Sequence, residues 1–187
     1  MTREDFILFS GGAAGAEAEF GANAERHGIE EVNFTFDGHS HVRSRGLRFL
    51  NHEELVAGDV SLAYVSRLLN RRYTDSPLLR KVLQSIWYQI NNGQEVYVIG
   101  SILPDKTVKG GTGWGAEFAK LCNKPLHVFD QDRGQWSAWD GSLQDWRTCT
   151  GADLPVVGHV HFTGTGTRVL NAAGKQAIAD LFARSFA

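Results

Sequence analysis

The chain is poor in the residues that would tie it to metal clusters, an oxidising compartment or a membrane. Among 187 residues there are only two cysteines, Cys122 and Cys149, and their spacing fits no zinc motif. This scarcity argues against a disulfide and favours a reducing, cytoplasmic setting. No apolar run reaches the length of a membrane span, and the apolar stretch in MTREDFILFSGG is too short for a signal peptide. We therefore expect a cytoplasmic protein without a membrane partner.

Strong charge of either sign is also missing. The 19 Lys and Arg residues nearly balance 21 Asp and Glu, so the net charge is −2. Non-specific binding to nucleic acid needs many phosphate contacts from a basic surface, and this composition does not favour it. Hydrophobic residues make up 42% of the chain and no linker, repeat or low-complexity tract divides it. We expect a single domain over residues 1–187.

Strand and helix patterns alternate along the chain. Apolar runs predict strands over 6–10, 32–36, 95–102, 125–129 and 156–162. Helical spacing and cap residues predict helices over 13–27, 52–70, 77–91, 112–122 and 171–186, with a polar loop over 37–48. Three tryptophans around Asp140-Gly141 indicate a hairpin over 135–147. The alternation predicts a Rossmann-like, doubly wound α/β fold with a mainly parallel sheet and a small added hairpin.

Glycine is plentiful, at 21 residues, and it clusters in loops over 10–15, 110–115 and 164–168. Each loop follows a strand and precedes a helix, the second after a short insert. Glycine lets the backbone approach an anion at a helix N-terminus, and parallel sheets bind ligands at this edge. We therefore predict a phosphate pocket, with tight strand–helix packing as the alternative. The predicted contacts are Ser10, Gly11, Gly12, Gly15, Gly110, Gly111, Thr112, Gly113, Trp114, Gly166, Thr167 and Arg168.

The loops do not match the commonest nucleotide-binding motifs. No Gly-Lys-Ser/Thr follows at P-loop spacing, and no loop has the GxGxxG order of dinucleotide-binding folds. The segment Gly110-Gly-Thr-Gly-Trp-Gly-Ala-Glu117 instead resembles the GGxGTxxE signature of the LONELY GUY phosphoribohydrolases, often misnamed lysine decarboxylases, with Trp114 in place of the threonine. Residues 10–16 resemble the SGGxxGA loop of Rossmann-like relatives that include the molybdenum-cofactor carriers. Gly166, Arg168 and Gly174 resemble the GxR…G loop of DprA/Smf-type proteins.

Together these loops make the chain similar to members of the SLOG group of nucleotide-binding folds, in a phage-type branch. The resemblance implies a nucleotide-type ligand, a homodimer and no cofactor. The phosphoribohydrolases cleave the N-glycosidic bond of a nucleoside monophosphate, which implies Glu117 as the catalytic carboxylate and Arg80 as a substrate-holding residue. A helix-dipole role for Glu117 and a solvated Arg80 are the alternatives.

Whether the protein is an enzyme stays open at this point. Trp114 should reshape the phosphate site, and the sequence offers no obvious second catalytic group. A non-catalytic protein that senses or sequesters a nucleotide-derived signal, such as an ADP-ribose derivative, is therefore the competing hypothesis. Glu17 and Glu19, just after the first loop, could receive a ribose hydroxyl or act as a second carboxylate, although we favour helix-surface positions for both.

The histidines and tryptophans lead to two further expectations. His39-Ser-His41 and His159-Val-His161 could ligate a metal, but no carboxylate joins them at motif spacing. We expect no metal and take His39 as a ligand contact from its loop. We expect the hairpin tryptophans to cover a core edge or a subunit contact rather than to stack on a base.

Overall fold

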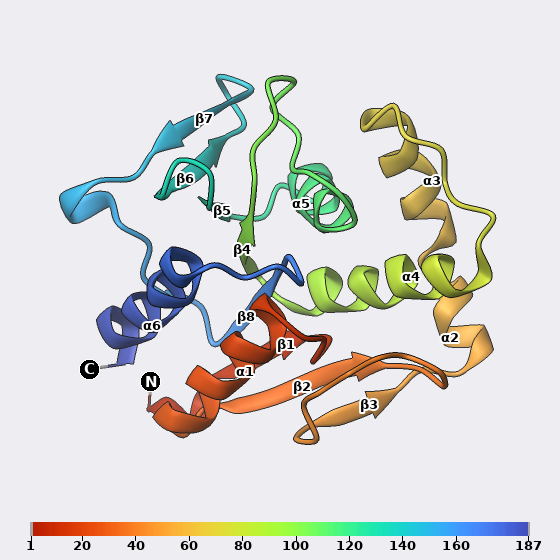
Figure 1. The fold of residues 1–187 in the computed structure, drawn as a ribbon, viewed down its shortest axis with the longest axis horizontal. Helices are drawn as coiled ribbons and strands as arrows, with labels where there is room; N and C mark the ends of the chain where they lie inside the picture. The colour runs from red at the N-terminus through yellow and green to blue at the C-terminus, as the bar shows by residue number, and fades with distance from the viewer. Residues whose placement is uncertain (1, 187) are drawn as a thin grey trace.

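In the computed structural model, which describes residues 2–186, those residues form one eight-stranded sheet in the order β3-β2-β1-β8-β4-β5-β6-β7 (Figure 1). The six strands from β3 to β5 are parallel, and β6 and β7 add an antiparallel hairpin. This confirms the predicted fold class. The strands are β1 (Ile7–Ser10), β2 (Glu30–Thr35), β3 (Leu47–Phe49), β4 (Glu95–Gly100), β5 (Leu126–Asp130), β6 (Gln135–Asp140), β7 (Asp145–Thr148) and β8 (His161–Gly166).

Helices cover both faces of the sheet (Figure 1). One face carries α1 (Ala16–His27) and α6 (Ala172–Phe186), which pack on each other. The other carries α4 (Pro77–Asn92) and α5 (Thr112–Leu121), with α2 (His52–Val56) and α3 (Asp59–Leu68) packed outside them. Short 3-10 turns occur at Arg3–Asp5 and Gly151–Asp153. Among the described residues, every helix falls short of the length and apolar character that crossing a membrane requires.

The central strands owe their apolar character to burial on both faces. Every residue of β4 is buried, and Tyr97 alternates with Val96 and Val98 between the two helical layers. A strand covered on both sides gains from a continuous apolar run, at about 25 cal/mol for each Å² of apolar surface removed from water. The strong apolar runs in the sequence therefore identify the interior of the sheet.

The last strand lies further along the chain than its predicted position, 156–162. It spans His161–Gly166, so Gly164 is a strand residue and not part of a loop. A Cβ at Gly164 would lie 2.5 Å from the ring of Phe20, so the glycine makes room for an aromatic side chain of α1. Before the strand, the N–H groups of Gly158 and His159 donate to Glu95 at 2.8 and 2.9 Å.

Two further elements differ from prediction. The helix expected over 52–70 is interrupted at Ala57–Gly58, where Gly58 lies against the ring of Trp87. The loop expected over 37–48 ends in β3, a three-residue edge strand with exposed Arg48 and Phe49. Neither feature has a strong local pattern, because both depend on packing against distant residues.

Candidate functional site

A cleft of about 750 Å³ lies at the carboxyl ends of β1, β8, β4 and β5. Its volume falls within the range of small-molecule sites, roughly 300–1,000 Å³. Loops that are far apart in sequence meet here, as expected for the ligand edge of a parallel sheet. The lining residues are Ala13, Glu17, His39, Ser76, Leu78, Leu79, Val82, Ser85, Ile86, Gln89, Gly100, Ser101, Lys109, Gly110, Gly111, Thr112, Gln131, Asp132, Thr165, Gly166, Thr167, Arg168 and Val169.

The turn before α5 is held from behind by Arg71. Its guanidinium donates to the carbonyl oxygens of Gly110 and Val108, each at 3.0 Å. Within residues 2–186, the N–H groups of Gly111 and Thr112 have no backbone acceptor. A Cβ at Gly111 would meet nothing within 4 Å. The turn thus leaves free amides and open space at a helix N-terminus that borders the cleft.

The other two glycine loops are locked to each other. Ala16 N–H donates to Thr167 O at 3.0 Å, and Thr167 N–H donates to Ile99 O at 2.9 Å. Gly15 has φ +94°, and a Cβ there would lie 2.5 Å from Thr167 O. These contacts leave no room for a side chain at Gly15. They fix the loop that carries Arg168 at the mouth of the cleft.

Two cations border the cleft without partners. Lys109 and Arg168 are both exposed lining residues, and neither side chain forms an ion pair or hydrogen bond with any residue from 2 to 186. Asp132 is the exposed acidic residue of the same rim. Unpaired Lys and Arg side chains beside a helix N-terminus suit the oxygens of an anionic group.

Glu17 is a buried carboxyl in the cleft lining. It accepts hydrogen bonds from Ala13 N–H at 3.0 Å and from the Thr165 hydroxyl at 2.9 Å. Burial raises the pKa of Glu17, although these two bonds, the Gln89 amide and the Arg168 charge each act to lower it. A carboxyl whose charged form is disfavoured keeps its proton to a higher pH than a solvent-exposed carboxyl does.

The Gln89 side chain lies beside Glu17. A Cβ at Gly11 would collide with Gln89 and lie 2.7 Å from Glu17 Oε2, so Gly11 allows the two side chains to meet. Gln89 is 1% exposed, and its Oε1 atom has no hydrogen-bond partner within the described chain. An unpaired buried amide oxygen is costly, which makes Gln89 a candidate for contact with a ligand or a water molecule.

Helix α4 supplies an apolar wall. Leu78, Leu79, Val82 and Ile86 line the cleft, and Leu78 and Leu79 are 57% and 46% exposed. Exposed leucines at the rim of a polar cleft can cover a planar ring. The cleft therefore combines a cationic rim, an apolar wall and a buried carboxyl–amide pair.

His39 lines the cleft as a neutral imidazole. Burial, with the nearby charges of Arg168 and His41, lowers the pKa of His39 to about 4. Its Nδ1 lies 3.0 Å from the Thr35 hydroxyl and its ring stacks on Phe36 at 4.7 Å. The neutral ring can donate or accept one hydrogen bond, according to its tautomer.

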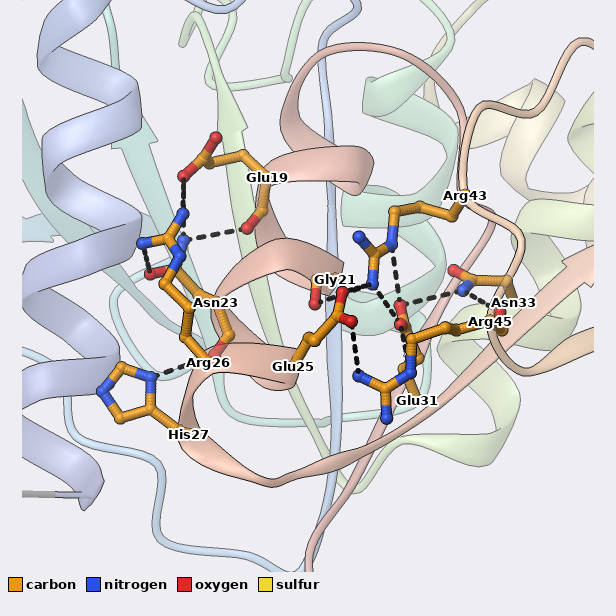
Figure 2. Close-up of polar contacts among 10 residues, drawn as sticks. All are labelled: Glu19, Gly21, Asn23, Glu25, Arg26, His27, Glu31, Asn33, Arg43 and Arg45. Atoms are coloured by element: carbon orange, nitrogen blue, oxygen red, sulfur yellow. Dashed lines mark hydrogen bonds and ion pairs between the residues drawn. The ribbon is translucent and has the colours of Figure 1, made fainter.

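An ion-pair network holds the segment that carries His39. Figure 2 shows Arg43, from residues 37–46, reaching to Glu31 of β2 and to Glu25 and the Gly21 carbonyl of α1. The Arg43–Glu25 bond is 2.8 Å, and the Asn33 amide donates to Glu31 at 3.0 Å. The Glu31 side chain is only 1% exposed, so it depends on these partners.

The structure separates the predicted ligand contacts into two groups. His39, Gly110, Gly111, Thr112, Gly166, Thr167 and Arg168 line the cleft, whereas Ser10, Gly11, Gly12, Gly15, Gly113 and Trp114 do not. Ser10 donates to Gly164 O at 2.7 Å in the core. Trp114 is buried behind the turn against Tyr73, at 5.6 Å between rings. These residues shape the loops from behind.

Glu117 and Arg80 lie away from the cleft. Glu117 pairs with Lys120 at 3.2 Å beside a smaller cavity of about 440 Å³. Five helical positions separate it from Thr112, which turns it about 140° away from that lining residue. Arg80 pairs with Asp59 at 2.8 Å and stacks over Tyr73 at 4.4 Å. No contact in residues 2–186 brings either side chain to the cleft loops.

The sequence did not predict some residues that line the cleft or support it from behind. Lys109 had a usable signal, because it directly precedes the glycine turn. Gln89 and Arg71 had none, since both act across long sequence distances. The hairpin tryptophans pack on the protein itself: Trp136 is buried, and Trp139 and Trp146 flank the Lys120 ammonium at 3.8 and 5.0 Å. Residues 2–186 hold no group of three or more His, Cys, Asp or Glu that could bind a metal ion.

Comparison with known proteins supports the fold but does not identify a family. No protein-family model matches the chain, and no curated protein matches it. Among solved structures, the chain is similar to the "Putative molybdenum carrier protein" from Syntrophus aciditrophicus SB, with a TM-score of 0.51 and 16% sequence identity. The alignment covers 100% of this chain and 97% of the other. This likeness shows a shared Rossmann-like architecture over the whole length and does not single out the phosphoribohydrolases.

Proposed function

We propose that the cleft binds a nucleotide or a nucleotide-derived phosphate ligand without cleaving it. The observation that carries this proposal is the convergence of Lys109, Arg168 and the free amides before α5 on one cleft. Cations and helix-terminal N–H groups together favour an anionic group. The free thiols of Cys122 and Cys149 fit the reducing, cytoplasmic setting that we propose for this binding.

The remaining cleft surfaces suit the rest of such a ligand. The leucines of α4 would cover the base, and Glu17 with Gln89 would receive ribose hydroxyls. This division leaves the phosphate at the rim, where Lys109 and Arg168 lie. The solved structure of similar fold bears a name that refers to carrying molybdenum. Molybdate and phosphate are both tetrahedral oxyanions, so we include both in the test.

The test is direct binding. Native mass spectrometry of freshly purified protein should show a co-purified nucleotide, and calorimetry should compare AMP, ADP-ribose, inorganic phosphate and molybdate. The double variant Lys109→Ala/Arg168→Ala should bind at least about tenfold more weakly, because charge-assisted hydrogen bonds are lost. Arg147→Ala, an exposed arginine of β7, is the matched control. No binding, or equal loss in both variants, contradicts the proposal.

A second candidate function is hydrolysis of an N-glycosidic bond with Glu17 as the carboxylate. The raised pKa of this buried group favours it. Glu17 would take a proton from water as the water oxygen bonds to C1′ of the ribose. The C1′–N bond would break with its electron pair leaving on the base, which then takes up a proton.

Turnover separates the two functions. Incubation with AMP, NAD and ADP-ribose either releases free base or returns intact ligand. Release that Glu17→Gln abolishes and Glu117→Gln preserves would establish hydrolysis at the cleft. Release abolished by Glu117→Gln alone would instead support the catalytic role implied by the resemblance. Intact ligand recovered after denaturation supports binding alone.

A further inference from the structure

The segment formed by α2 and α3 keeps one helical phase across its interruption. Its buried positions are Leu55, Gly58, Leu62, Val65 and Leu69, which follow each other at intervals of three and four residues. This is the spacing of a single amphipathic helix face. Ala57 and Gly58, between the two helices, both have right-handed helical backbone angles. Helices α2 and α3 are separate, because within residues 2–186 the N–H groups of 58–61 donate to no backbone carbonyl, but their buried positions continue in one phase across the break.

The opposite side of this unit is also apolar. Val56, Val60, Tyr64 and Leu68 recur at every fourth residue and are 41%, 71%, 59% and 54% exposed. Val60 lies about 180° around the helix from the centre of the buried face. Figure 1 shows α2 and α3 at the outer edge of the molecule, beyond α4. A row of exposed apolar side chains of this length marks an interaction surface.

Charges of opposite sign border this row at its two ends. Glu53 precedes Val60 by seven residues and Arg67 follows it by seven. Within α3, seven residues turn the helix by about 700°, so Arg67 lies within about 20° of Val60. Glu53 lies in α2, where it precedes the exposed Val56 by three residues. Both residues are exposed, and neither forms an ion pair within the described range of 2–186.

We propose that this face, Glu53 to Leu68, pairs with a second copy of itself. Along this face an acidic residue lies near one end, apolar residues lie in the middle and a basic residue lies near the other end, with Val60 at the centre. An antiparallel two-fold pairing about Val60 would place Val60 on Val60, Val56 on Tyr64, and Glu53 on Arg67 of the other copy. Such an interface is self-complementary, as a two-fold axis requires. A parallel pairing would set like charges together.

The contact would also reach the ligand cleft. Asp59 of α3 accepts hydrogen bonds from Arg80 and Gln84 of α4 at 2.8 and 2.7 Å. Helix α4 forms the apolar wall of the cleft, so pairing would brace that wall. One helix pair buries less surface than a standard interface, and we expect a dissociation constant of about micromolar order.

Analytical ultracentrifugation across about 1–100 µM, a range chosen for a small interface, tests the pairing. Wild type should shift from monomer to dimer over this range. Val60→Glu, at the centre, should weaken the dimer at least about 100-fold without lowering the melting temperature. Leu143→Glu is the matched control, because Leu143 is 70% exposed on the β6–β7 turn. A wild type that stays monomeric, or Val60→Glu dimers as tight as those of Leu143→Glu, overturns the proposal.

A mixing experiment tests the orientation. Glu53→Arg makes both ends of the face basic, and Arg67→Glu makes both ends acidic. At low salt each variant alone should dimerise more weakly than wild type by about tenfold. An equimolar mixture should recover dimer as a heterodimer, detected by native mass spectrometry. A mixture no better than the separate variants, with both variants folded by circular dichroism, excludes the antiparallel arrangement.

Discussion

At the scale of single residues, Glu17 links the cleft to the stability of the fold. Burial raises its pKa, so the folded state disfavours the charged carboxylate relative to the unfolded chain. The unfolded carboxyl titrates at about pH 4.3. The folded state therefore becomes less stable as pH rises from the pKa of the unfolded carboxyl through the higher pKa of the folded state. Above the folded-state pKa the loss of stability stays constant.

Glu17→Gln should remove this loss. The variant's melting temperature, relative to wild type, should increase as pH is raised from 4 toward 8, because only wild type pays the cost of ionisation. The measured quantity is how the difference in melting temperature between variant and wild type changes with pH. Any pH-independent change in hydrogen bonding cancels from this comparison. Glu30→Gln, at an exposed position, is the matched control for removing one carboxyl group. Thermal melts at matched ionic strength measure both, and a difference that falls with rising pH would contradict the assignment.

Two neighbouring glycines should respond in opposite ways. Gly111→Ala meets open space and should leave stability nearly unchanged, yet its methyl group would occupy the anion side of the cleft and weaken ligand binding about tenfold or more. Gly113→Ala would collide with Val108 O and should cost about 1–3 kcal/mol of stability. Calorimetry and chemical denaturation separate the two effects. Equal losses of stability in the two variants would show that Gly111, like Gly113, is required for folding and not for ligand binding.

The glycines also show where sequence reasoning stops. Their clustering after strands correctly predicted which edge of the sheet carries the loops. It could not show that Gly164 makes room for Phe20 while Gly111 faces open space. For Gly164 the packing partners are more than 50 residues away in the sequence, and Gly111 has no such partner. The resemblance around Glu117 likewise gave no information on which side of α5 faces the cleft.

At the scale of elements, the strands and helices differ in how far local pattern defines them. β4 is apolar throughout because both its faces are buried, and α4 begins at the predicted Ser76-Pro77. β3 was missed because it is three residues long and exposed at the sheet edge. It pairs with β2 directly after the segment that the Arg43 network holds (Figure 2).

Arg43→Ala tests the importance of that network. It would leave the Glu31 carboxylate buried without its main partner, which should cost about 3 kcal/mol of unfolding free energy. Arg45→Ala is the control, since Arg45 is 43% exposed and contacts Glu25 and Glu31 only at 3.7 Å, and it should cost less than about 1 kcal/mol. Urea denaturation of both variants checks this. Similar costs would mean that the 37–46 segment is held by its backbone contacts.

At the scale of the whole molecule, the sheet should be most rigid at its centre. β8 bonds to both β1 and β4, whereas β3 and β7 each have one partner strand. Amide hydrogen exchange should be slowest in β1, β8 and β4 and several orders of magnitude faster in β3 and β7. Mass spectrometry of peptic peptides can measure this. Edge strands as protected as β8 would indicate a partner covering those edges.

The position of β8 also limits the order in which the strands of the sheet can pair. Although it is the last strand in sequence order among the described residues, β8 occupies the gap between the two halves of the sheet, pairing Leu8 with Phe162 and Val98 with Thr165. Until it emerges from the ribosome, β1 and β4 each present an open backbone edge, which is prone to wrong pairing. The two halves of the sheet can therefore be joined, and the ligand cleft completed, only after β8 is free to pair with both.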